Sequence, residues 1–157
     1  MDELTKLTKK IERYAKSQTS LRVALSTTLA IHKPRIFQFG LDASRNKIGT
    51  YSTKPTYISA GRQARQTGKT KFVGGYAEYK RDVGKNPGYV ILRDTDQMYA
   101  DYGIVFTGNF GFGFKNKHNF EKSQWMEEKY RKKIFGLAKN EINVLAKTLV
   151  KNLIKAL

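Results

Sequence analysis

The chain has 157 residues, a length typical of one domain, and 39% of them are hydrophobic. Its 30 lysines and arginines outnumber 13 acids, so the formal net charge is +17, which favours contact with polyanions but does not specify a fold. The absence of cysteine excludes disulfides, thiolate zinc sites and a cysteine nucleophile. No apolar stretch reaches the roughly 18 residues that span a bilayer, and the charged N-terminus is unlike a secretory signal, so we expect no membrane contact.

Apolar residues near the N-terminus recur at intervals of three and four. The pattern includes Leu4, Leu7, Ile11, Tyr14, Leu21 and Leu25. It predicts a helix from about residue 2 to about residue 31 that ends before Pro34, because the residue before a proline avoids helical geometry. The polar stretch 17–20 leaves open whether this is one helix or two. We expect the apolar face to pack on the protein's own core, since only about three heptads are available for a coiled coil.

Two β-hairpins are predicted farther along the chain. The first covers residues 36–51, where polar turn residues separate two apolar runs. The second covers residues 104–114, and its return strand alternates glycine with three phenylalanines on one face: Phe110, Phe112 and Phe114. Glycine on the opposite face allows another backbone or aromatic ring to lie close.

Residues 52–75 are the least core-like part of the chain. They contain four glycines and few large apolar side chains, and no acid occurs between Ala43 and Ala77. We predict a long exposed loop or arm, because loops of this length in compact domains are usually functional or disordered. We call residues 52–75 the basic arm. Its basic residues are candidates for contact with DNA or with a neighbouring subunit: Lys54, Arg62, Arg65, Lys69 and Lys71.

Helical patterns dominate the C-terminal part. We predict a short helix carrying Met98 and capped by Asp94 or Thr95, a broken helix over 120–131, and a final helix over about 138–156. The final helix has an apolar stripe opposite its lysines. The predicted fold is therefore a single α+β domain over 1–157, with a long N-terminal helix, antiparallel hairpins forming a small sheet, a C-terminal helix packed on it, and the basic arm.

The residue types that perform chemistry do not form a known pattern. His32 and His118 lack metal-ligand spacing, and we expect surface or capping roles for both. The acids Asp94, Asp96 and Asp101 lack the glycine and distal glutamate of a calcium loop, so helix capping is the expected role. The segment 61–70 has Gln63 where a phosphate-binding loop needs glycine. We therefore expect no catalytic, cofactor-binding or metal-binding residues, and a protein that is not an enzyme.

The charge suggests two kinds of partner. Basic residues of the arm alternate with tyrosines, a composition that suits nucleic-acid phosphates and bases. However, the chain has no aromatic ribonucleoprotein motif and no recognition helix. Contact with nucleic acid and contact with another protein subunit are therefore equally open at this point.

Five motifs occur in a characteristic order over most of residues 35–157. They are a hairpin from Ile36-Phe37 ending in Gly49-x-Tyr51-Ser52, then Gly75-Tyr76-Ala77-Glu78-Tyr79-Lys80, Val90-x-Leu92-x-x-Thr95-x-x-Met98, Phe112-Gly113-Phe114, and Ile134-Phe135-Gly136-Leu137 with Glu141. In this order they resemble the tailed-phage virion-morphogenesis proteins, the family of tail-completion and head–tail connector (neck) components. One departure is Asp96, which stands where that family usually has glycine, so the turn there is expected to differ.

The resemblance implies a structural virion protein without catalytic residues. It implies a homo-oligomeric ring, a hexamer or dodecamer, that joins head to tail or ends the tail tube, is assembled in the host cytoplasm, and contacts portal, neck or tail-tube proteins. A ring needs two different complementary patches on each subunit. The basic arm and the strand of Phe110, Phe112 and Phe114 are the candidates, with nonspecific DNA contact also open. The alternative function is a small basic nucleic-acid-binding protein.

Overall fold

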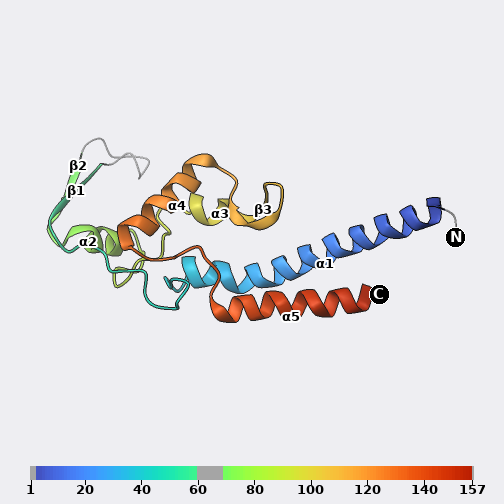
Figure 1. The fold of residues 1–157 in the computed structure, drawn as a ribbon. Coiled ribbons are helices and arrows are strands. Elements are labelled where there is room, and N and C mark those ends of the chain that lie inside the picture. Colours follow the sequence, from blue (N-terminus) through green and yellow to red (C-terminus); the bar gives the residue numbers. More distant parts are fainter. Residues whose placement is uncertain (1–2, 60–68, 157) are drawn as a thin grey trace.

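The computed structural model describes residues 3–59 and 69–156. Within these ranges the chain forms five helices and two separate antiparallel sheets of two strands each, which confirms the α+β class (Figure 1). The four strands therefore form two separate hairpins and not one small sheet. Arg62 and Arg65 of the basic arm lie outside the described residues, as do the side chains of Leu4, Leu7, Ile11 and Tyr14.

The first and last helices form an antiparallel pair. Helix α1 (Glu3–Phe37) runs unbroken through the polar stretch 17–20, and α5 (Lys139–Ala156) confirms the predicted final helix. These two helices make the most extensive contact between elements in the described structure (Figure 1). The N-terminal part of α1 extends beyond the C-terminus of α5.

The predicted end of the first helix before Pro34 is wrong. Pro34 lies inside α1, and its carbonyl accepts hydrogen bonds from the N–H groups of Gln38 and Phe39 at 2.8 and 2.9 Å. Outside the first turn of a helix, a proline removes one hydrogen bond and its ring crowds the carbonyl four residues earlier, so this last turn needs stabilisation from elsewhere. Burial of Ile36 and Phe37, both 0% exposed, stabilises the extra turn.

The predicted hairpin over 36–51 is also wrong, although its turn exists. Ile36 and Phe37 belong to α1, and the only ladder contact described in this region is a single bridge between Leu41 and Lys47. Asp42 closes the turn, because its Oδ1 accepts the N–H of Asn46 at 2.9 Å. An apolar run of this length fits the buried end of a helix as well as a strand, and here burial against the core decided between them.

The basic arm contains more structure than a loop. Strands β1 (Thr56–Ser59) and β2 (Lys69–Phe72) pair antiparallel, and helix α2 (Gly75–Asp82) follows where no helix was predicted. Gly75 has a φ of +69°, and a Cβ atom there would lie 2.5 Å from the carbonyl oxygens of Ser52 and Lys54. Glycine therefore permits the chain to return close to the start of the arm and begin α2.

The remaining elements follow the predicted order with two corrections. Helix α3 (Gln97–Asp101) leads into the predicted second hairpin, formed by β3 (Tyr102–Phe106) and β4 (Phe110–Phe114). Neither Asp94 nor Thr95 caps α3, because Asp96 holds the cap position and its side chain makes no cap hydrogen bond. Helix α4 (Lys117–Tyr130) is continuous rather than broken, and is capped by Asn116, whose side chain accepts the N–H of His118.

The hydrophobic core lies where the C-terminal end of α1 meets the second hairpin and the link before α5. Phe37 packs edge-to-face against Tyr99, with the ring centroids 5.7 Å apart. Phe37 and Tyr102 are at the centre of a cluster of buried residues: Ile36, Ile48, Val90, Leu92, Met98 and Ile134. This core fixes the α1–α5 pair at one end and leaves the other end of the pair free of the globular part (Figure 1).

Candidate assembly surfaces

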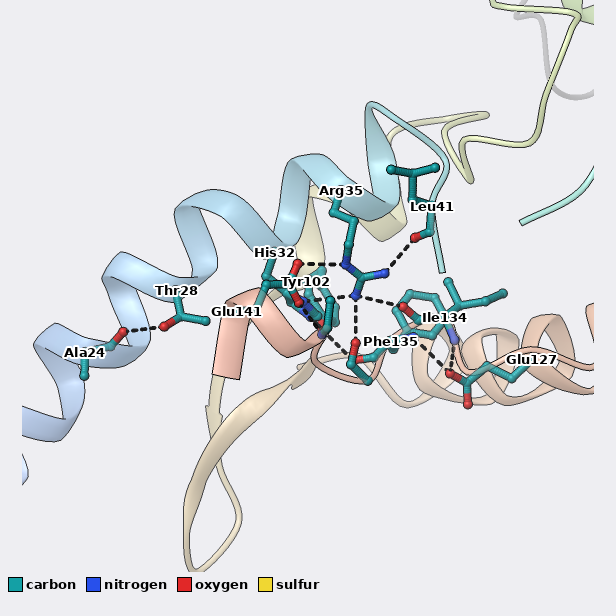
Figure 2. A network of polar contacts seen from close by, with 12 residues as sticks. Ala24, Thr28, His32, Arg35, Leu41, Tyr102, Glu127, Ile134, Phe135 and Glu141 are labelled. Atoms are coloured by element: carbon teal, nitrogen blue, oxygen red, sulfur yellow. Dashed lines mark hydrogen bonds and ion pairs between the residues drawn. The ribbon is translucent and has the colours of Figure 1, made fainter. Parts of the chain in front are cut away.

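A buried polar network, which we call the Glu141 network, connects α1, β3 and α5 through His32, Arg35, Tyr102 and Glu141. The Glu141 carboxylate lies 2.8 Å from His32 Nδ1 and accepts a hydrogen bond from Arg35 Nε at 2.7 Å (Figure 2). It also accepts the backbone N–H of Ala138 at 2.8 Å, just before α5 begins. One carboxylate therefore both completes the first turn of α5 and attaches it to α1.

Arg35 extends this network to the link before α5. Its guanidinium donates to the carbonyl oxygens of Leu41 and Gly136, both at 2.7 Å, and to that of Ile134 at 3.2 Å. Glu127 of α4 accepts the N–H groups of the same link, from Ile134 at 2.7 Å and Phe135 at 2.9 Å (Figure 2). These contacts fix the direction in which α5 leaves the core.

Burial and neighbouring charges shift the pKa values of Glu141 and Tyr102 in the network. Burial raises the pKa of Glu141, but the hydrogen bonds from His32 and Ala138 and the charges of His32 and Arg35 outweigh it, so the pKa lies below its ordinary value. Burial also raises the pKa of Tyr102, whose Oη lies 2.6 Å from His32 Nε2. Glu141 is thus an anion at neutral pH, held between two basic side chains.

A tyrosine, a histidine and a glutamate in contact with one another also occur in proton-transfer sites. The low solvent exposure of these three side chains favours a structural role here. Tyr102, His32 and Glu141 are 2%, 0% and 1% exposed. An open depression beside the network is lined by Ile31, Phe39 and Arg45 together with Arg35 and Glu141. Because the polar atoms of both are engaged inside the protein, the arrangement is suited to holding helices rather than binding a substrate.

The outer face of α5 exposes large apolar side chains. Ile142, Val150 and Ile154 are 50%, 54% and 66% exposed, and with Ala146 they recur every four residues along the helix. An open groove runs along part of this face, with a row of lysines on one side of it: Lys147, Lys151 and Lys155. We call Ile142, Ala146, Val150 and Ile154 the α5 outer stripe. The sequence predicted a single apolar stripe opposite the lysines. Its members Leu145, Leu149 and Leu153 are partly buried, whereas the α5 outer stripe is exposed and lies beside the lysines.

The basic arm exposes Lys69, Lys71 and a tyrosine on one face of its hairpin, and a further lysine just before the hairpin begins. Lys54, Lys69 and Lys71 are exposed, and Tyr57, which is 64% exposed, pairs across the strands with Lys71. The opposite face is partly buried, and Phe72 contacts the ring of Tyr79 on α2 edge-to-face at 5.5 Å. The hairpin therefore presents a cationic face with one aromatic ring.

A buried lysine fixes the base of the basic arm. Lys80 of α2 is 2% exposed, and its ammonium donates to Asp94 Oδ1 at 2.8 Å. The same ammonium lies 5.4 to 6.0 Å from the centroids of three tyrosine rings, those of Tyr51, Tyr76 and Tyr79. This arrangement holds α2, and with it the arm, against the core.

The second hairpin turns its phenylalanines and its glycines to opposite faces. Phe112 lies 5.1 Å from the ring of His32 and Phe114 4.9 Å from that of Tyr102, so both pack within the chain, whereas Phe110 lies 4.9 Å from Phe106 at the tip. On the other face, a Cβ added at Gly103 or Gly111 would meet nothing within 4 Å. The prediction that Phe110, Phe112 and Phe114 contact a neighbouring subunit stays a prediction.

Several buried polar residues were missed or misplaced from the sequence. His32 is buried rather than at the surface, while His118 is exposed. Asp101 accepts from the N–H of Asn116 before α4, and Asp96 pairs with Arg93, so the three acids do not act together. The spacing of three between His32 and Arg35, on the face of Leu25 and Thr28, was the available signal for the network.

No group of three potential metal ligands occurs among the residues that the structure describes. Of the helices in that part of the chain, none is both long and apolar enough to cross a bilayer. Comparisons with protein-family models, with curated proteins and with solved structures give no match to this chain.

Proposed function

We propose that this chain is a structural virion protein of a tailed phage, a head–tail connector, neck or tail-terminator subunit that assembles as a homo-oligomeric ring of six or twelve copies. The observation that carries the proposal is the α5 outer stripe, whose three large aliphatic residues are half or more exposed. Apolar surface of this kind marks an interaction site, and the motif order described above supports the class of assembly.

Two separate surfaces support a ring. A ring is built from a heterologous interface, in which one patch of a subunit meets a different patch of the next. The basic arm and the free end of the α1–α5 pair lie at opposite ends of the molecule (Figure 1). Each end can therefore supply a contact surface, for a copy of the chain or for a neighbouring protein.

The proposed protein acts by binding and not by catalysis. Its neighbours would be portal, neck or tail-tube proteins in the virion, after assembly in the host cytoplasm. The Glu141 network gives α5 a fixed direction, which a ring subunit requires, because small errors in the angle between subunits prevent closure.

Charge reversal of the arm lysines tests whether the basic arm takes part in assembly. We expect Lys54→Glu, Lys69→Glu and Lys71→Glu together to leave the fold intact, since all three are exposed, but to reduce incorporation into particles at least tenfold. Complementation of a phage that lacks the gene, with counts of infectious particles, measures this. The matched control reverses three other exposed lysines, Lys115, Lys117 and Lys139. Equal incorporation of both variants would contradict a role for the arm.

A nucleic-acid-binding protein is the second candidate. The cationic face of the arm favours it, because Tyr57 and its cross-strand partner Lys71 combine a stacking surface with a phosphate-binding charge. Under this function, the same triple variant would lose affinity for single-stranded or duplex DNA while the control variant keeps it. Infectivity that is normal for both variants, with DNA binding lost only in the first, would favour this candidate over the ring.

A further inference from the structure

The N-terminal part of α1 extends past the helix that covers the rest of it. Glu141 contacts His32 and Arg35, and from there the antiparallel α5 continues to Ala156, about 22 Å farther at roughly 1.5 Å per residue. The same length along α1 ends near Ser17. Residues 3–16, which we call the α1 overhang, therefore extend beyond α5, as Figure 1 shows.

A partner along its apolar face would stabilise the overhang, which is a terminal extension of α1. An isolated helix of this length is marginal in water, and most helices are stabilised by packing of an apolar face. The sequence of the overhang has such a face, since Leu4, Leu7, Ile11 and Tyr14 recur at helical spacing. In the described structure α5 ends before it could cover this segment.

The α5 outer stripe is an exposed apolar surface that a second helix would cover. Its four residues occupy one face over three turns, and its large members are half or more exposed. A second helix with an apolar face would cover it by side-chain packing between helices. The overhang has about the same length as the stripe, so one helix segment of a second copy suffices.

We propose that the α1 overhang of one subunit packs along the α5 outer stripe of the next copy. This inference rests on the proposed ring and specifies one of its interfaces. The contact is heterologous, because the overhang and the stripe are different surfaces of the chain, and each copy offers both. Head-to-tail repetition of such a contact produces a ring when the rotation closes.

The charges of the two surfaces are consistent with an apolar contact. The lysines beside the stripe lie on one side of it, and the overhang carries basic residues outside its apolar positions. Long lysine side chains can cover apolar surface with their methylene groups while the ammonium stays in water. Attraction between opposite charges is therefore not what holds this contact.

Two single substitutions test the proposal. Ile11→Glu places a charge on the overhang. Val150→Glu places a charge on the stripe, at a residue that is 54% exposed. We expect each variant to stay monomeric at concentrations where the unmodified chain assembles, as measured by light scattering after size exclusion. The control is Phe120→Glu on α4, where the residue is 49% exposed and belongs to neither surface, and this variant should assemble normally.

Mixing the two variants gives the decisive result. The Val150→Glu chain keeps an intact overhang and the Ile11→Glu chain an intact stripe, so a mixture can form one contact and should give heterodimers and nothing larger. Absence of heterodimers would overturn the inference. If instead the unmodified chain never self-associates, the proposed ring itself fails; if it assembles and both variants assemble equally, only this interface is wrong.

A cross-linking experiment guards against variants that fail to fold. Because the chain has no cysteine, an Ile11→Cys chain can be mixed with chains carrying one cysteine at Ala146, Val150 or Ile154 and then oxidised. A disulfide requires Cα atoms within about 7 Å, so it reports direct contact. We expect a cross-linked dimer with at least one stripe position and none with Lys139→Cys. Failure at all three positions would overturn the inference.

Discussion

Glu141 connects two helices, because a single carboxylate receives donors from α1 and from the backbone just before α5. Its removal would leave the Arg35 guanidinium buried without a counter-charge. Loss of one partner from a buried ion pair is far more costly than loss of an exposed pair. The same carboxylate also sets how stability depends on pH.

We expect Glu141→Gln to lower the free energy of unfolding by about 3 kcal/mol, because the substitution leaves a buried charge unpaired. The control is Glu121→Gln, since Glu121 is 57% exposed in its pair with Lys117 and should change stability by less than about 0.5 kcal/mol. Urea denaturation followed by circular dichroism measures both. Equal effects would show that the network does not stabilise the fold.

The pH dependence supplies a second readout for the same pair of variants. The pKa of Glu141 is lower in the folded chain than its ordinary value of 4.5, so its contribution is complete above that value and is lost as the pH falls through the folded pKa. We therefore expect the stability difference between the unmodified chain and Glu141→Gln to shrink on acidification below about pH 4.5. A difference that stays constant at low pH would contradict the assigned pKa direction.

At the scale of the element, the two faces of the β3–β4 hairpin differ in how closely they are packed within the chain. Its phenylalanine face packs inside the chain, while Gly111 on the other face has open space around it. A Cβ at Gly113 would instead lie 3.1 Å from Val105 Cγ2, which is tight. The same substitution at Gly111 and at Gly113 therefore compares an open position with a crowded one on the same face.

We expect Gly111→Val to leave stability unchanged or to raise it by about 0.5 kcal/mol, since a β-branched residue suits a strand with free space. Gly113→Val should lower it by more than about 1 kcal/mol through contact with Val105. If the glycine face meets another subunit, Gly111→Val should in addition reduce assembly. Thermal denaturation and light scattering measure the two effects. Greater destabilisation by Gly111→Val would contradict the arrangement of the faces.

The elements that the sequence predicted well have local signals. The glycine alternation of β4 and the apolar spacing of α5 depend only on neighbouring residues. The Glu141 network has no such signal, because His32 and Glu141 are 109 positions apart. Helix α2 was missed for a similar reason, since the buried Lys80 is stabilised by Asp94 and by rings that only the folded chain brings together. The run at Ile36 and Phe37 fits either a helix or a strand, and the core decided it.

At the scale of the whole molecule, charge and apolar surface have opposite effects on association. Each copy carries a formal net charge of +17, so copies repel one another at low ionic strength. The contact proposed between the α1 overhang and the α5 outer stripe is apolar and is not weakened when charges are screened. Nucleic-acid binding through the basic arm would depend on those charges directly.

We therefore expect self-association to strengthen as salt is raised from low to physiological concentration, because the screening length falls to about 8 Å and the repulsion between copies weakens. Affinity for DNA should fall over the same range, since each phosphate contact releases counterions. Sedimentation velocity measures the first and fluorescence anisotropy with labelled DNA the second, on the same protein preparation. Val150→Glu should abolish the first trend and leave the second unchanged, while reversal of the arm lysines should weaken the second. Self-association that decreases with salt would instead mean that the subunits are held by ion pairs, and the apolar contact would have to be abandoned.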